Sequence, residues 1–284
     1  MQGREPEGGS FVYESFTRVS PRKKRRRNAQ KDSSLPFNLV VRATEAIAAD
    51  GGWLLHCEEL FQLALREVRI RPQDILCLGL GSPCASRDAR AQLAFLGRLS
   101  AVSNIEAANV FVYDPVFTDT DRQLLQGLGM QGLVGNEACI SADDVNHSLD
   151  RPTILYMPHC DLKLYEIVLR ANWTYERLSG LMFVANCFSD YIDNNPASKL
   201  ERESPCLMRI GKDDLVGERV SLLIPRCLPT APFVHSRPLP TSRPFPTAFS
   251  NLSVQYVRGT PLSLESDAFW DVLPLQPSCE RDMC

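Results

Sequence analysis

Residues 75–81 read Ile-Leu-Cys-Leu-Gly-Leu-Gly, a short apolar run that ends in two glycines. A strand buried on both faces of a parallel sheet has this continuous apolar character. Residues 87–99 follow with apolar side chains at the spacing of a helix, and residues 109–114 read as a second strand that ends in a carboxylate. A strand, a helix and a second strand in this order predict two parallel strands joined by a crossover helix.

The same alternation continues further along the chain. Thr118 and Asp119 offer N-cap side chains to the next helix. Residues 154–157 and 181–185 are short apolar strands, and residues 162–169 have the pattern of a helix between them. Strands that alternate with crossover helices predict the α/β class, with a Rossmann-like, mainly parallel sheet and helices on both of its faces.

Further segments flank this alternation. Residues 37–68 carry apolar side chains at a spacing of about 3.6, which predicts two helices separated at Gly51-Gly52 and joined to a domain that spans 36–192. Residues 193–248 contain a proline-rich run, which we expect to be irregular because proline removes a backbone donor. Residues 249–284 read as one more strand and a short helix or loop, so this extension is a candidate to complete the domain.

Residues 1–35 precede the domain, and we expect them to form a flexible, disordered arm. Six consecutive positive charges lie in it, at Arg22, Lys23, Lys24, Arg25, Arg26 and Arg27. Such a run repels itself and cannot share a buried face. Two interpretations stay open: a functional arm, which is an import signal read by a nuclear import receptor or a weak nucleic-acid contact, and a solvated tail. The net charge of the whole chain is only −3, so direct nucleic-acid binding is not expected.

The cysteines indicate a reducing compartment. There are 10 of them, their spacings are irregular, no Cys-x-x-Cys occurs, and several lie inside apolar strands. The first residues lack the apolar stretch of a secretory signal. We therefore expect reduced thiols in a cytoplasmic protein, with the nucleus as a second location if the arm is used. No apolar run approaches the roughly 20 residues that cross a bilayer, so no membrane partner is expected.

Three motifs resemble, in their order and spacing, the signature of the SRR-like family, whose name abbreviates "sensitivity to red light reduced". They are Gly-Leu-Gly-Ser at residues 79–82, Val-Tyr-Asp-Pro at 112–115 and Tyr-Met-Pro-His-Cys at 156–160. Supporting matches are Gln92-Leu93-Ala94, Leu128-Gly129, Asn172-Trp173 and Asn186. The resemblance covers residues 70–192, with a fainter match at 253–270. It departs at 195–247, where prolines stand in place of the helical stretch expected of the family.

The resemblance implies an animal member of the family with a regulatory role rather than an enzymatic one. Plant relatives act in light signalling and the circadian clock, a fungal relative in microtubule function, and animal relatives in haem biosynthesis and clock-gene expression. It therefore implies a non-catalytic regulator of haem biosynthesis and of circadian clock-gene expression. It transfers no catalytic residue and no ligand site to this chain, and the sequence names no partner protein.

Gly79, Gly81 and Ser82 form a turn between a strand and a helix, where a ligand can approach the backbone. Cys84 replaces the third glycine of Gly-x-Gly-x-x-Gly. Asp114 ends the second strand, as a ribose-binding carboxylate would, but follows Gly79 by 35 residues instead of the roughly 20 of dinucleotide folds. A class I methyltransferase tolerates this spacing, so the alternative function is a methyltransferase-like enzyme that uses S-adenosylmethionine. Otherwise, the glycines only allow tight packing and Asp114 caps a loop.

His159 and Cys160 follow a strand and precede a helix, so we expect them at the same sheet edge as Gly79 and Asp114. His159 could serve as a general base or metal ligand, and Cys160 as a thiol whose pKa is lowered by a helix N-terminus. Either could bind haem iron, which makes haem the second candidate cofactor. One histidine and one cysteine are too few for zinc, so no metal site is predicted. A structural histidine and a buried thiol are the alternative.

Overall fold

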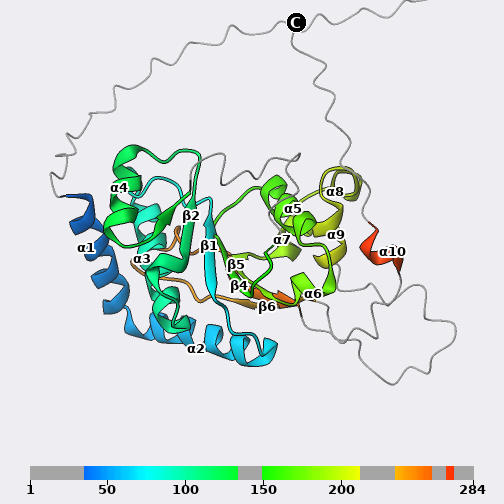
Figure 1. The fold of residues 1–284 in the computed structure, drawn as a ribbon, viewed down its shortest axis with the longest axis horizontal. Helices are drawn as coiled ribbons and strands as arrows, with labels where there is room; N and C mark the ends of the chain where they lie inside the picture. The colour runs from blue at the N-terminus through cyan, green and yellow to red at the C-terminus, as the bar shows by residue number, and fades with distance from the viewer. Residues whose placement is uncertain (1–34, 134–148, 212–233, 258–266, 272–284) are drawn as a thin grey trace, which may run out of the picture. The chain divides into compact units, whose positions relative to one another are not determined.

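The computed structural model of the chain describes residues 35–133, 149–211, 234–257 and 267–271 (Figure 1). The basic arm at residues 22–27 lies outside the described residues, and so does part of the proline-rich run. The flexible arm therefore stays a prediction.

Strands and helices alternate along the described chain. The strands are β1 Asp74–Leu78, β2 Val110–Tyr113, β3 Gln131–Gly132, β4 Thr153–Met157, β5 Leu181–Asn186, β6 Val234–Pro238 and β7 Leu252–Val257. The helices are α1 Pro36–Ala49, α2 Gly51–Val68, α3 Arg87–Ser103, the 3-10 helix η1 Ala107–Asn109, α4 Asp119–Gly127, α5 Leu162–Ala171, α6 Tyr175–Leu178, α7 Phe188–Asp193, α8 Ala197–Glu203, α9 Pro205–Gly211 and α10 Asp267–Trp270. The strands and helices predicted between residues 75 and 185 are all present, with ends that differ by a few residues.

The described strands form one sheet in the order β3-β2-β1-β4-β5-β7-β6. Strands β3, β2, β1, β4 and β5 pair in parallel, whereas β7 is antiparallel to both β5 and β6. Cys77 of β1 is level with Val112 of β2 and with Tyr156 of β4. The loops that follow β1, β2 and β4 therefore leave the same edge of the sheet. The predicted mainly parallel sheet is confirmed.

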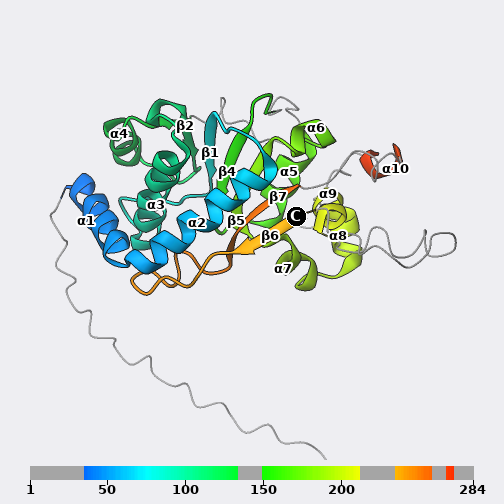
Figure 2. The same ribbon diagram turned by 90° about the horizontal axis from the view of Figure 1, so that it is seen from below.

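Helices cover both faces of this sheet, as predicted (Figure 1). On one face, Tyr156 packs in a core with α1, α2 and α3, and its ring centroid lies 6.2 Å from that of Phe95. In Figure 2, α2 lies in front of the strands, on this face. On the other face, Leu155 joins a core that contains Tyr165 of α5. Successive strand side chains point to opposite faces, so Leu155 and Tyr156 belong to different cores. Burial of the Leu155 side chain stabilises the fold by about 2 kcal/mol.

The segment at residues 193–248 is not irregular throughout, contrary to our prediction. Its first part forms α8 and α9, in which Leu200, Leu207 and Ile210 are buried. Its last part contains β6, which lies at the edge of the sheet and ends at Pro238. Proline has no backbone N–H to donate. It is tolerated in an edge strand because one side of that strand has no neighbouring strand, so no hydrogen bond is lost there. The strand predicted after residue 249 is β7, and it completes the sheet between β5 and β6.

The two glycines after α1 also differ from the prediction. Gly51 and Gly52 begin α2, and Asp50 alone separates the two helices. Glycines in a first helical turn are tolerated because that turn lacks a full set of backbone hydrogen bonds in any case. α2 has 18 residues but carries charged side chains, and none of the described helices is long and apolar enough to span a membrane.

Candidate functional site

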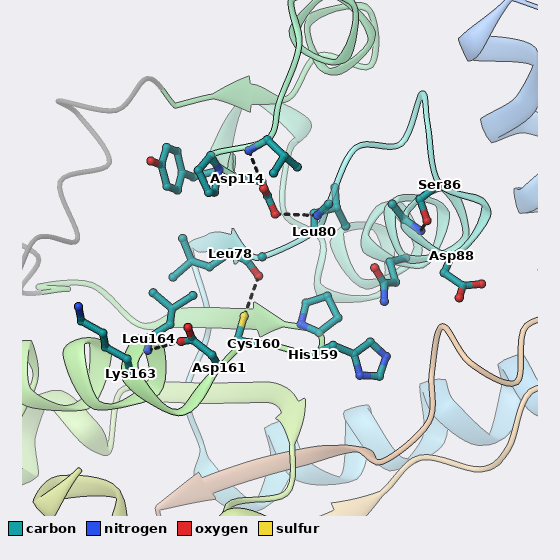
Figure 3. Close-up of a pocket in the computed structure, with 18 of the residues that line it drawn as sticks. Leu78, Leu80, Ser86, Asp88, Asp114, His159, Cys160, Asp161, Lys163 and Leu164 are labelled. Atoms are coloured by element: carbon teal, nitrogen blue, oxygen red, sulfur yellow. Dashed lines mark hydrogen bonds between the residues drawn. The ribbon is translucent and has the colours of Figure 1, made fainter. Parts of the chain in front are cut away.

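An open hollow of about 700 Å³ lies at the carboxyl ends of β1, β2 and β4 (Figure 3). Loops from all three strands line it, with Gly79 and Gly81 after β1, Asp114 after β2, and His159 and Cys160 after β4. Side chains near the start of α3 and of α5 complete its walls. They include Ser86, Asp88, Ala89 and Gln92, and Asp161, Lys163, Leu164 and Ile167. The three sequence-distant turns therefore converge on one site, as expected.

The hollow lies where the chain changes its direction of travel across the sheet. From β1 the chain proceeds to β2 and β3 on one side, and it then crosses to β4 and β5 on the other side of β1. The connections after β1 and β4 thus leave in opposite directions and open a crevice between them. Open α/β sheets bind their ligands in such a crevice.

The glycine turn after β1 is closed by protein groups. Gly79 and Gly81 have φ angles of 70° and 73°, a region that residues with a side chain rarely adopt. The carboxylate of Asp114 accepts a hydrogen bond from the Gly81 backbone N–H at 2.7 Å and another from the Val116 N–H at 2.9 Å (Figure 3). In a dinucleotide fold, backbone N–H groups of this turn face a phosphate. Here Asp114 accepts from one of them and joins the loops after β1 and β2.

Cys160 is a buried thiol. Its sulfur donates a hydrogen bond to the Leu78 carbonyl, with an S···O distance of 3.3 Å (Figure 3). Burial, together with the negative charges of Asp161 and Asp114, raises the pKa of Cys160 to about 12. The thiol is therefore protonated at neutral pH, which is the opposite of the lowered pKa that we considered. The helix N-terminus does not lower this pKa because the sulfur points toward β1, while Asp161 accepts the N–H of Leu164.

His159 connects the loop after β4 to the β6–β7 loop, residues 239–251. Its φ angle is 56°, and its backbone N–H donates to the side chain of Asn186 at 2.8 Å. The ring Nε2 lies 3.0 Å from the carbonyl oxygen of Thr247 and 3.2 Å from that of Ala248. Carbonyl oxygens only accept hydrogen bonds, so Nε2 carries a hydrogen. This nitrogen cannot act as a general base while it holds the loop.

The β6–β7 loop is the part of the site that sequence reasoning missed. The Thr247 hydroxyl donates to the carboxylate of Asp88 at 2.7 Å, and the Gln92 side chain donates to the Ala248 carbonyl at 3.0 Å. Both partners lie at the start of α3, and both line the hollow. The prolines of this region predicted a loop, but no pattern in the sequence indicated that it would lie beside α3.

Ser82 does not line the hollow, unlike the other predicted ligand-binding residues. Its hydroxyl lies 2.9 Å from each carboxylate oxygen of Asp121. Asp121 also accepts hydrogen bonds from the backbone N–H groups of Cys84 and Thr118, both at 2.9 Å. Ser82 therefore anchors the glycine loop to the start of α4.

The candidate cofactors fit these residues to different degrees. Haem iron would find no thiolate at Cys160, where the thiol is protonated, and Nε2 of His159 holds the loop, so Nδ1 is the imidazole nitrogen that retains a lone pair. S-adenosylmethionine requires no such axial ligand, and the carboxylate of Asp114 retains lone pairs for further hydrogen bonds. Among the described residues, no group of three or more histidine, cysteine or acidic side chains could hold a metal ion.

The fold and the hollow define an α/β protein with a doubly wound, mainly parallel sheet and a ligand-type crevice at its switch point. The chain belongs to the SRR1 domain family, whose model matches residues 57–256. This match confirms the resemblance seen in the three sequence motifs. It also extends to β7, across the proline-containing region where the motifs alone left the end of the domain in doubt.

Three relatives have names that refer to this family. The SRR1-like protein of Mus musculus is 30% identical over 135 residues, which cover 48% of this chain and 52% of the relative. The SRR1-like protein of Drosophila melanogaster is 31% identical over 147 residues, or 51% of this chain and 49% of the relative. The protein SENSITIVITY TO RED LIGHT REDUCED 1 of Arabidopsis thaliana is 32% identical over 113 residues, which cover 40% of this chain and 39% of the relative. The chain thus spans about half the length of the mouse and fly relatives, and no solved structure matches it.

Proposed function

We propose that the protein is a non-catalytic regulator that acts in the control of haem biosynthesis and of circadian clock-gene expression. The observation that carries this proposal is membership of the SRR1 family over residues 57–256. The name of the Arabidopsis relative refers to reduced sensitivity to red light, which describes a response rather than a reaction. A regulatory role for this chain is consistent with that name.

The state of the reactive side chains supports the non-catalytic part of the proposal. The Cys160 thiol is buried and hydrogen-bonded, the Nε2 atom of His159 holds the β6–β7 loop, and the Ser82 hydroxyl contacts Asp121. A nucleophile needs an adjacent base or a lowered pKa, and a general base needs an available lone pair. Cys160 and the Nε2 atom of His159 do not meet these conditions. Ser82 does not line the hollow, and its neighbouring carboxylate, Asp121, is a weak base because hydrogen bonds lower its pKa to about 2.

A complementation experiment in cells that lack the endogenous protein tests the proposal. Total haem and the rhythm of a clock-gene reporter are the two readouts. We expect the full chain to restore both. Val116→Arg places a long cation in the hollow and should restore neither, because Val116 lines the hollow and is 59% exposed, which makes the fold tolerant of the change.

Leu55→Arg is the matched control, since Leu55 is 57% exposed on α2 and does not line the hollow. It should restore both readouts as the wild-type chain does. If the wild-type chain restores neither haem nor rhythm, the proposed function is wrong. If Val116→Arg restores both, the regulation acts through another surface.

We also propose that the protein is cytoplasmic and that its basic arm, residues 22–27, binds an import receptor and brings a fraction of it to the nucleus. Six consecutive positive charges support this proposal. Replacement of all six by alanine should abolish the nuclear fraction of a fluorescent fusion. An unchanged nuclear fraction would show that the arm is not an import signal.

A methyltransferase-like enzyme that uses S-adenosylmethionine is the second candidate, and the strand order favours it. An antiparallel β7 inserted between β5 and β6 beside a parallel sheet is also the arrangement of class I methyltransferases. In those enzymes an acid at the end of the second strand binds the ribose, and Asp114 holds that place here. The test is transfer of a labelled methyl group to extracts of cells that lack the protein. Transfer should be lost in Asp114→Ala; its absence with the wild-type chain excludes this candidate.

A further inference from the structure

The charges around the hollow are mostly negative. Asp88, Asp114 and Asp161 line it, and Lys163 is the cation among its lining residues. Arginine, the usual partner of phosphate groups, is absent from the described residues that line it. Since like charges repel, an anionic ligand meets a net unfavourable field here and a cationic ligand a favourable one.

One backbone donor is already used at each of three places that could compensate for this field. The N–H of Gly81 donates to Asp114, so the glycine turn presents a carboxylate where a phosphate would bind. At the start of α3, the Ser86 side chain accepts the N–H of Ala89. At the start of α5, the charged side chain of Asp161 accepts an N–H of the first turn. At each of these three places, where an α/β fold commonly holds phosphate, a protein oxygen therefore already accepts one backbone N–H.

The walls of the hollow are otherwise suited to a flat organic molecule. Leu78, Leu80, Tyr113, Val116 and Ile167 line it, and they are apolar or aromatic. Its volume of about 700 Å³ lies within the range of small-molecule sites. A molecule with an apolar ring, hydroxyl groups for the carboxylates and a positive charge matches this combination.

We propose that this crevice binds a phosphate-free nucleoside that carries a positive charge, and that it rejects nucleotides and dinucleotides. The inference rests on the proposed function, for which such a ligand is the signal that the regulator detects. S-adenosylmethionine has these properties, and sinefungin has an ammonium group in place of its sulfonium. S-adenosylhomocysteine keeps the nucleoside but lacks that charge.

Isothermal titration of the full chain at low ionic strength, with each of five probes, tests the inference. The probes are S-adenosylmethionine, sinefungin, S-adenosylhomocysteine, NAD and ATP. We expect the first two to bind, the uncharged thioether to bind about fivefold or more weakly, and NAD and ATP not to bind. Asp161→Asn should weaken the binding of S-adenosylmethionine and sinefungin by about fivefold, because asparagine keeps the helix cap and removes only the charge.

Asp119→Asn is the matched control, because Asp119 lies in the first turn of α4 and does not line the hollow. It should leave all affinities unchanged. Three results would each overturn the inference: binding of NAD or ATP as tight as that of the cations, equal affinity for S-adenosylmethionine and its thioether, or no binding of either cation. None of these results alters the outcome of the complementation experiment. A wrong ligand class can therefore be distinguished from a wrong regulatory function.

Discussion

The sulfur of Cys160 lies in the space that a side chain at Gly79 would require. A Cβ atom placed on Gly79 would lie 2.6 Å from the Cys160 Sγ atom, far inside the contact distance of two such atoms. The φ angle of Gly79, 70°, also disfavours any residue with a side chain. Cys160, on a loop distant in the sequence, therefore requires glycine at this position.

This relationship predicts that the two glycines of the turn differ in their tolerance of alanine. Gly79→Ala combines left-handed strain with a steric overlap, and we expect it to lower the free energy of unfolding by about 3 kcal/mol. Gly81→Ala carries only the strain, about 1 kcal/mol, because its Cβ would lie 3.6 Å from that of Ala89, an ordinary contact. Urea unfolding of both variants measures the difference. Cys160→Ala in the Gly79→Ala background should recover the steric part, and equal losses in the two single variants would contradict the argument.

The lowered pKa of Asp121 predicts that the protein loses stability in acid. Burial alone would raise the pKa of Asp121, but hydrogen bonds from Thr118 and Cys84 lower it from 3.8 to about 2. A carboxyl whose pKa is lower in the folded state stabilises the fold above its unfolded pKa and loses this contribution as the pH falls through its folded pKa. We expect a loss of about 2 kcal/mol from this group between about pH 5 and pH 2.

Asp121→Asn isolates this contribution. The variant should be less stable than the wild type at neutral pH, and the difference should shrink toward about pH 2, because a protonated carboxyl is neutral like the amide. Urea unfolding of both proteins across this pH range measures it. A difference that stays constant with pH would mean that the charge of Asp121 does not contribute.

The contacts of Glu166, on α5, predict that this side chain stabilises the start of α9. The Glu166 carboxylate is buried and accepts the backbone N–H groups of Cys206 and Leu207, at 3.0 and 3.1 Å. Glu166→Ala leaves both buried donors without an acceptor, so we expect a loss of about 2–4 kcal/mol and faster hydrogen exchange at these two amides. Glu201→Ala, on the exposed side of α8, should cost less than about 0.5 kcal/mol. Comparable losses in the two variants would exclude a capping role.

The sequence predicted the parallel core because each of its strands carries a local signal. The apolar run that contains Cys77 and the carboxylate of Asp114 mark the ends of β1 and β2, and β-sheet geometry then places their loops at one edge. The convergence of Gly79, Asp114 and His159 follows from topology alone. Their chemistry does not, because it depends on where each side chain points.

Residue type alone therefore does not determine where a side chain points. Cys160 precedes a helix, as a reactive thiol would, yet its sulfur is buried against Leu78. Ser82 follows the glycines, yet it turns toward Asp121. The edge strand β6 ends in Pro238 and could not be distinguished from a loop, so the β6–β7 loop beside the site had no local signature. In each case the deciding contact joins residues far apart in the chain, which spacing cannot reveal.

The imidazole of His159 is expected to limit local opening of the β6–β7 loop. Its Nε2 atom contacts the carbonyl oxygens of Thr247 and Ala248, so His159→Ala removes a bifurcated hydrogen bond worth about 1 kcal/mol. The loop is also held by the Trp53 side chain, which donates to the Pro240 carbonyl at 2.7 Å. We therefore expect local rather than global opening, with hydrogen exchange in the loop about fivefold faster and a small loss of overall stability.

A second substitution separates the ring from the backbone. His159 has a φ angle of 56°, which strains alanine but not glycine, so His159→Gly should be more stable than His159→Ala by about 1 kcal/mol. Loop exchange should be accelerated equally in both variants, because both lack the imidazole. His56→Ala, on the exposed side of α2, serves as the control and should change neither quantity. If loop exchange in His159→Ala matches that of the control, the imidazole does not hold the loop, and its Nε2 atom is available to a ligand in the hollow.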